Sequence, residues 1–99
     1  MRLLAGLYER VEATTVMGGQ AVAYELLGQA WIALGARRRR AVADAGAPVR
    51  IVETANAETR ADARLVEGRV LRFGGGDWVI RTVEEPAPGR ARLSLERTR

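Results

Sequence analysis

The chain has 99 residues, enough for a modest hydrophobic core, so we treat residues 1–99 as a single domain. Its net charge is +4, all sixteen basic residues are arginines, and 47% of its residues are hydrophobic, which is too apolar for a disordered chain. Cysteine and histidine are absent, which excludes disulfides, thiolate chemistry and a histidine base. We expect no metal and no cofactor, because the preferred zinc and copper ligands are missing.

The first two strands are predicted on either side of a glycine turn. Residues 7–16 mix apolar and charged side chains, with Leu7, Glu9, Val11 and Ala13 on one side of a period-two pattern, which indicates a strand. The glycine pair at 18–19 follows, and paired glycines supply the positive φ angles of a tight hairpin turn. A return strand is expected over residues 21–35, with a helix over residues 24–34 as the competing interpretation.

An arginine run follows the second predicted strand and consists of Arg37, Arg38, Arg39 and Arg40. Without it the chain has twelve basic and twelve acidic residues, so the run equals the whole net charge. We expect residues 36–48 to form a long charged loop, partly helical, between the second and third strands. A helix over residues 36–45 would be marginal, because it places the arginines at its positive end.

Four adjacent like charges repel one another, so ordering the run requires phosphate groups or carboxylates from another subunit. A solvated surface run without a partner is the alternative interpretation. No aromatic residues are interleaved with the arginines, so any nucleic-acid contact would be to backbone phosphate and independent of base sequence.

The remainder of the chain predicts a further strand and then a closing meander. Residues 48–54 are rich in β-branched side chains and indicate a third strand, whereas residues 55–64 are expected to be weakly helical or looped. Alternating patterns then predict strands over residues 65–73, 78–83 and 90–97. Together these elements predict an all-β fold, a small antiparallel β-barrel or sandwich.

Catalytic signals are weak. Ser94 is the only serine and has no histidine to activate it. The tripeptide from Gly18 to Gln20 matches that of translation release factors, but a hairpin turn explains it, and a hydrolase of that kind would depend on Gln20. The glycines at 74–76 precede a predicted strand rather than the helix that a phosphate-binding loop requires. We therefore expect no enzymatic activity.

In the order and spacing of these pieces the chain resembles the phage head-tail joining proteins, also called head-tail adaptors, head closure proteins or stoppers, which occur in gene transfer agents too. Trp78 stands where the family more often has tyrosine, and the family does not specify the sequence of the loop that holds the arginines. The matching pieces are residues 7–11, 30–33, 48–52, 73–83 and 92–96.

The resemblance implies a non-catalytic, barrel-like subunit that forms a homo-oligomeric ring at the neck of the particle, between the portal or adaptor ring and the tail terminator ring. In some members the loop between the second and third strands projects into the channel and helps retain packaged double-stranded DNA. By position that loop corresponds to residues 36–48. The arginine run would then meet DNA phosphates or acidic residues of an adjoining ring.

A free-standing small-barrel nucleic-acid-binding protein is the alternative hypothesis. It differs from a neck protein in predicting that the isolated monomer binds DNA with strong salt dependence. The apolar run in residues 1–10 is too short for a signal peptide, and nowhere do about twenty apolar residues run together to cross a bilayer. We therefore expect a soluble protein, made in the bacterial cytoplasm, without membrane contact.

Overall fold

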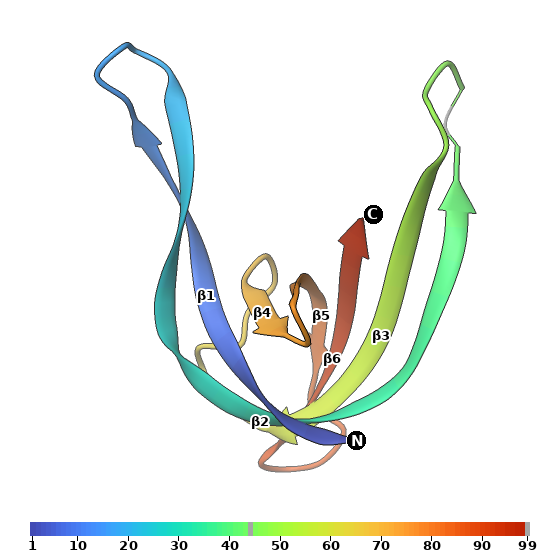
Figure 1. Ribbon diagram of the computed structural model, residues 1–99. Coiled ribbons are helices and arrows are strands. Elements are labelled where there is room, and N and C mark those ends of the chain that lie inside the picture. The colour runs from blue at the N-terminus through green and yellow to red at the C-terminus, as the bar shows by residue number, and fades with distance from the viewer. Residues whose placement is uncertain (44, 99) are drawn as a thin grey trace.

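The computed structural model describes residues 1–43 and 45–98, and its regular elements are all strands (Figure 1). They are β1 (Arg2–Thr14), β2 (Gln20–Val42), β3 (Arg50–Arg60), β4 (Val70–Phe73), β5 (Gly76–Glu84) and β6 (Arg90–Thr98). Every strand pair is antiparallel, so the predicted all-β class is confirmed. None of the described residues lies in a helix, and hence none lies in one that could cross a membrane.

The six strands form one sheet that closes on itself. Their order is β1-β2-β3-β6-β5-β4, and the closure is the pairing of β1 with β4. The closed part is small because β4 has only four residues. The register shifts at Leu7/Tyr8, between Leu34 and Arg37, and between Ile80 and Thr82, where bulges allow the strands to bend around a narrow barrel.

The interior of this barrel is filled by side chains that alternate along the strands. Trp78 and Ile80 on β5 and Leu93 and Leu95 on β6 are buried, as their period-two pattern predicts. The Trp78 ring stacks on Phe73 with ring centres 5.6 Å apart and planes 2° from parallel. The other residues of the core are Ala5, Leu7, Ile32, Ala55, Ala57, Leu65, Leu71 and Ala91.

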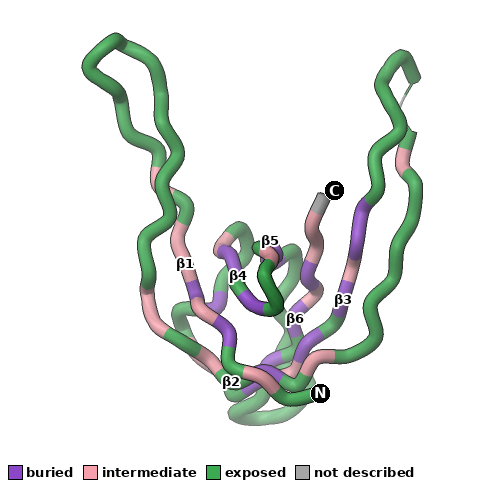
Figure 2. The backbone as a smooth tube through the Cα atoms, viewed as in Figure 1, coloured by how far each residue is buried: buried purple, intermediate pink, exposed green. Residues whose placement is uncertain are grey.

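Two long hairpins extend beyond the barrel, because β2 has 23 residues and continues past the barrel at both of its ends. The first arm, residues 8–27, pairs β1 with the start of β2, and the second arm, residues 36–54, pairs the end of β2 with β3. The arms flank β4, β5 and β6 and diverge from one another (Figure 1), and most of their residues are exposed (Figure 2). Because an isolated two-stranded hairpin is marginally stable in water, such arms favour a partner.

The prediction of a long, partly helical loop over residues 36–48 is wrong. Residues 37–42 belong to β2, and each has a cross-strand partner on β3. A strand points successive side chains to opposite faces, so it separates neighbouring arginines that a helix would crowd at its positive end. The remaining connection, residues 43–49, is a short turn region in its described part.

Two further boundaries differ from expectation. Residues 55–60 are the second half of β3 rather than a loop or helix, because they pair with β6 along their whole length. Of residues 65–73 only the last four form a strand, and residues 61–69 cross the end of the barrel in turns. The competing helix over residues 24–34 is also excluded, since these residues lie in β2.

The hairpin predicted at the first glycine pair is confirmed. Gly18 has φ of +80°, in the left-handed region that favours glycine. The amide N–H of Thr15 donates to the carbonyl of Gly19 at 2.7 Å, and Gln20 begins β2. The tripeptide shared with release factors is therefore the end of a hairpin turn.

Candidate partner-binding arms

The inner face of the second arm carries Arg37 and Arg39 at the open end of the barrel. The guanidinium carbon of Arg37 lies 5.6 Å from the centre of the Trp78 ring. Nε of Arg39 lies 3.2 Å from Oε1 of Glu53, whose side chain is only 2% exposed. Both arginines are therefore engaged within the fold.

Glu53 joins the arm to the barrel through a second arginine. Its Oε2 accepts a hydrogen bond from Nη2 of Arg97 at 3.2 Å, and the guanidinium carbon of Arg97 lies 4.6 Å from the centre of the Trp78 ring. A side chain at Gly76 would collide with this guanidinium, so the close approach requires glycine. The cluster connects β3, β5 and β6 where the second arm leaves the barrel.

The outer face of the second arm carries three cations, Arg38, Arg40 and Arg50. Arg38 and Arg40 alternate along β2 with the inward Arg37 and Arg39, and they pair with Thr54 and Val52 of β3. Arg50 shares their face because it pairs with Val42, two residues beyond Arg40. All three arginines are exposed, and none forms an ion pair within residues 1–43 and 45–98. Asp44 lies outside the described residues. The outer face of the arm therefore carries a row of positive charge without an ion pair among the described residues; Glu96, which lines the same hollow as Arg38 and Arg40, is paired with Arg81.

The four arginines predicted as one site are thus divided between two faces. The structure brings Arg37 and Arg39 to the mouth of the barrel and leaves Arg38 and Arg40 facing outward. Sequence reasoning missed Arg50, which joins the outer row from the opposite strand. The period-two alternation that it applied to the last third of the chain would have divided the run if residues 36–42 had been recognised as a strand.

The first arm carries the opposite charge. Glu9 of β1 lies directly opposite Glu25 of β2, so two carboxylates share one face of the hairpin. Glu9 has a distant ion pair with Arg69, at 3.7 Å, and Glu25 has none among the described residues. Like charges directly opposite in an antiparallel pair are destabilising, so this face favours a cation from outside the hairpin.

The other face of the first arm carries an exposed apolar row. Val22, Tyr24 and Leu26 alternate along β2, with exposed fractions of 46%, 43% and 60%. At the tip, Val16 and Met17 are almost fully exposed. Exposed apolar residues that gather on one element, rather than scattering singly, are typical of a protein contact surface.

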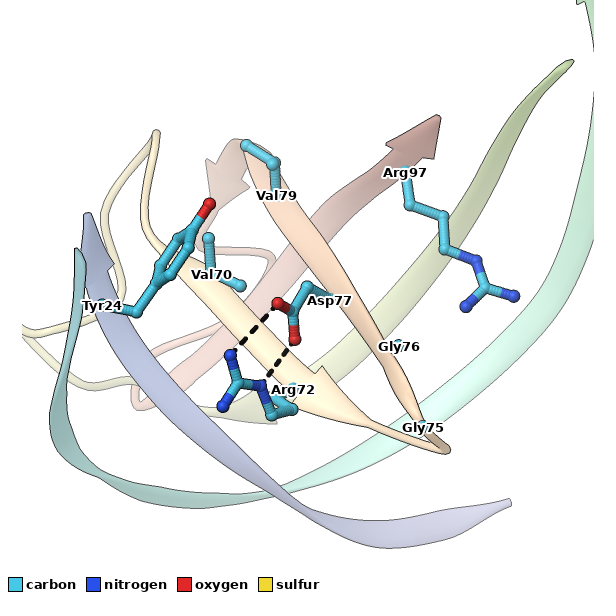
Figure 3. A pocket seen from close by; sticks show the side chains of 8 residues that line it. All are labelled: Tyr24, Val70, Arg72, Gly75, Gly76, Asp77, Val79 and Arg97. Carbon is cyan, nitrogen blue, oxygen red and sulfur yellow. Dashed lines mark hydrogen bonds and ion pairs between the residues drawn. The ribbon is translucent and has the colours of Figure 1, made fainter. Parts of the chain in front are cut away.

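A hollow lies between this row and the β4–β5 hairpin (Figure 3). In it Arg72 donates from Nε and Nη2 to the two carboxylate oxygens of Asp77 at 2.7 and 3.2 Å, and its guanidinium carbon lies 4.3 Å from the centre of the Tyr8 ring. The hydrogen bond to Asp77 raises the pKa of Arg72 above its ordinary value. Its charge is paired, so the hollow suits contact rather than proton transfer. The residues lining it are Tyr24, Val70, Arg72, Gly75, Gly76, Asp77, Val79 and Arg97.

The base of the first arm is fixed by an arginine from the turn region before β4. Arg64 donates from Nη1 to the carbonyl of Leu27 at 3.0 Å, beside the bulge in β2, and a side chain at Gly28 would collide with it. Arg64 is held by Asp62, with its Nη2 2.7 Å from Oδ2. This hydrogen bonding lowers the pKa of Asp62 to about 2.

No protein-family model matches the sequence, and neither does any curated protein. A solved structure does match: one chain of the structure described as the virion of a native gene transfer agent (GTA) particle. The match has a TM-score of 0.74 at 19% sequence identity, and it covers 98% of this chain and 94% of the other. The two chains share a fold. Because the match spans almost all of both chains, it includes the two arms as well as the barrel.

Proposed function

We propose that this protein is a structural, non-catalytic component of a phage or gene transfer agent particle, placed as a ring at the neck between portal or adaptor and tail. The observation that supports this proposal is the fold shared with a gene transfer agent virion chain over nearly the full length of both. The order of sequence pieces that resembles head-tail joining proteins supports the same role. The neck position and the ring are our inference.

The shape of the subunit suits a ring better than a solitary protein. The first arm pairs β2 with β1, and β3 begins to pair with β2 at Ile32, so the other edge of β2 has no strand partner over residues 20–31 in the described part of the chain. Within this edge the carbonyls of Leu27 and Trp31 accept side-chain hydrogen bonds from Arg64 and Thr59. Unpaired strand edges are templates for association with another chain. The exposed apolar row and the two oppositely charged arms add further contact surface.

The second arm would meet one of two partners in such a ring. Packaged DNA would take the arginines as phosphate contacts, whereas a protein neighbour would supply carboxylates. The two partners predict different results for the isolated chain. A DNA-directed arm gives binding to duplex DNA that weakens steeply with salt, and a protein-directed arm gives self-association or binding to an adjoining ring protein.

The proposal is tested on particles. We expect purified native particles to contain this polypeptide, detected by mass spectrometry, and averaged electron cryomicroscopy images to place it at the neck. Deletion of its gene should leave heads that lose DNA or lack tails. Particles that contain none of the polypeptide would refute the proposal.

A variant test separates the arm from the barrel. Replacing Arg38 and Arg40 by Ala leaves the inner cluster intact and should lower the yield of full, tailed particles. The matched control replaces Arg60 and Arg90 by Ala; these are exposed, face one another across β3 and β6, and form no ion pair with any described residue. Equal yields of full, tailed particles from both variants would show that Arg38 and Arg40 of the second arm have no specific role in particle assembly.

A free-standing nucleic-acid-binding barrel is the second candidate, and the outward row of Arg38, Arg40 and Arg50 favours it. It requires the isolated monomer to bind duplex DNA with a salt dependence equivalent to several phosphate contacts. Fluorescence anisotropy across a salt series measures this. If the isolated monomer binds DNA weakly and the protein is incorporated into particles, the neck role is favoured over the free-standing nucleic-acid-binding barrel.

A further inference from the structure

Each arm carries charges that the fold compensates only in part. Glu9 has Arg69 at 3.7 Å, whereas Glu25 on the first arm and Arg38, Arg40 and Arg50 on the second have no ion pair among the described residues. Residues 8–27 hold three glutamates and one arginine, for a net charge of −2. Residues 36–54 hold five arginines, one glutamate and one aspartate, for a net charge of +3. The two arms therefore carry net charges of opposite sign, and the remaining residues carry a net charge of +3, which completes the total of +4.

The complementary charges lie on defined faces. On the first arm Glu9 and Glu25 share the face that continues the lining of the barrel, because Leu7 of that lining is two residues before Glu9. The neighbours on this face are small, chiefly alanines, so another strand pair can approach it closely. On the second arm Arg38, Arg40 and Arg50 occupy the outer face.

These faces do not neutralise each other within one molecule. The arms diverge on either side of β4, β5 and β6 (Figure 1), and no ion pair joins them in the part of the chain that the structure describes. A second copy can supply the missing charge, because the two surfaces differ and each copy carries both. A contact between two different surfaces of identical subunits is head-to-tail, and it closes a ring when the rotation between copies permits.

We propose that neighbouring copies associate through their arms, with the row of Arg38, Arg40 and Arg50 on one copy packed against the face of Glu9 and Glu25 on the next. This inference rests on the proposed ring and names the contact that builds it. The same contact gives Glu25 a counter-ion and relieves the repulsion along the arginine row. The partner of the arginine row is then a second copy of this chain rather than DNA.

A charge-exchange experiment tests the inference on the full-length chain. One variant carries Arg38→Glu and Arg40→Glu, so that both of its arms are acidic, and the other carries Glu9→Arg and Glu25→Arg, so that both are basic. Each should associate with itself at least about tenfold more weakly than the natural chain, by sedimentation equilibrium at low ionic strength. An equimolar mixture should recover association, because unlike arms then face one another. Raised salt should weaken the association of the natural chain and that of the mixture alike.

The matched control carries Arg60→Glu and Arg90→Glu, which change the net charge as much as the acidic variant but lie away from both arms. It should associate like the natural chain. Circular dichroism establishes that each variant is folded, and Glu25→Arg alone replaces the basic double variant if Glu9 proves necessary for folding. Recovery in the mixture also excludes misfolding as the cause of the loss.

Several outcomes overturn the inference. It is wrong if the natural chain stays monomeric at the highest soluble concentration, if the mixture fails to recover association, or if the control is weakened equally. It is also wrong if the acidic variant loses DNA binding but keeps its self-association, since the outer row then serves DNA. The proposed function is judged separately, by the presence of the polypeptide at the neck of particles, and can survive any of these results.

Discussion

The guanidinium of Arg97 lies over the indole ring of Trp78, its carbon 4.6 Å from the ring centre, at the open end of the barrel. Only 14% of the Arg97 side chain is exposed, and its carboxylate partner Glu53 is more deeply buried still. Breaking such a pair from one side leaves a poorly hydrated charge behind. The cluster is therefore the point at which the second arm depends on the barrel.

Replacing Glu53 with Gln should lower the free energy of unfolding by about 3 kcal/mol, because Arg97 then keeps its charge without a carboxylate partner. Urea denaturation measures the change. The matched control is Glu58→Gln, whose partner Arg92 and own side chain are 48% and 47% exposed. Glu58→Gln should lower the free energy of unfolding by less than about 1 kcal/mol. Equal losses would contradict the role of burial.

The two halves of the arginine run should differ in their effect on stability. Arg37→Ala with Arg39→Ala removes the contacts with Trp78 and Glu53 and should lower the free energy of unfolding by about 1–2 kcal/mol. Arg38→Ala with Arg40→Ala removes the same charge from the outer face and should change it by no more than about 0.5 kcal/mol. Thermal unfolding of both double variants gives the comparison, and identical melting curves would refute the division of the run.

The two tryptophans should also behave differently. Trp78 is fully buried, so Trp78→Leu should cost about 2–4 kcal/mol through lost contacts and a residual cavity. Trp31 is 59% exposed, and Trp31→Leu should change the free energy of unfolding by less than about 1 kcal/mol. Acrylamide should quench the fluorescence of the chain that keeps only Trp31 more strongly than that of the chain that keeps only Trp78.

Acid should weaken the contact between Asp62 and Arg64 at the base of the first arm. The pKa of Asp62 is lowered from 3.8 to about 2 by its hydrogen bonds with Arg64. The ionised carboxylate of Asp62 therefore contributes fully to stability only when the pH is above 3.8, the ordinary value that applies to the unfolded chain. That contribution should disappear as the pH falls from about 4 to about 2, and it should stay below about 1 kcal/mol because the pair is partly exposed. The gap in unfolding free energy between the natural chain and Asp62→Asn should close over this range. A gap that is constant with pH would exclude the carboxylate as its source.

Local patterns in the sequence predicted much of the barrel. Leu93 and Leu95 alternate with polar residues and are buried. Trp78 and Ile80, two residues apart on β5, are buried as well, until a bulge reverses the alternation at Thr82, which is exposed. The pattern failed over residues 36–42, where four arginines conceal any apolar period. A strand there is stabilised by its partners on β3, which local propensity does not register.

By itself the sequence determined the all-strand class, the glycine hairpin and the concentration of charge in one short run, because each depends on residues adjacent in the chain. Tertiary structure alone decided that β2 continues through the arginines, that Arg37 and Arg39 turn inward, and that Arg38 and Arg40 join Arg50 on an open face. The physical reason is that these outcomes depend on cross-strand register, which brings together Arg39, Glu53 and Arg97 from distant parts of the chain.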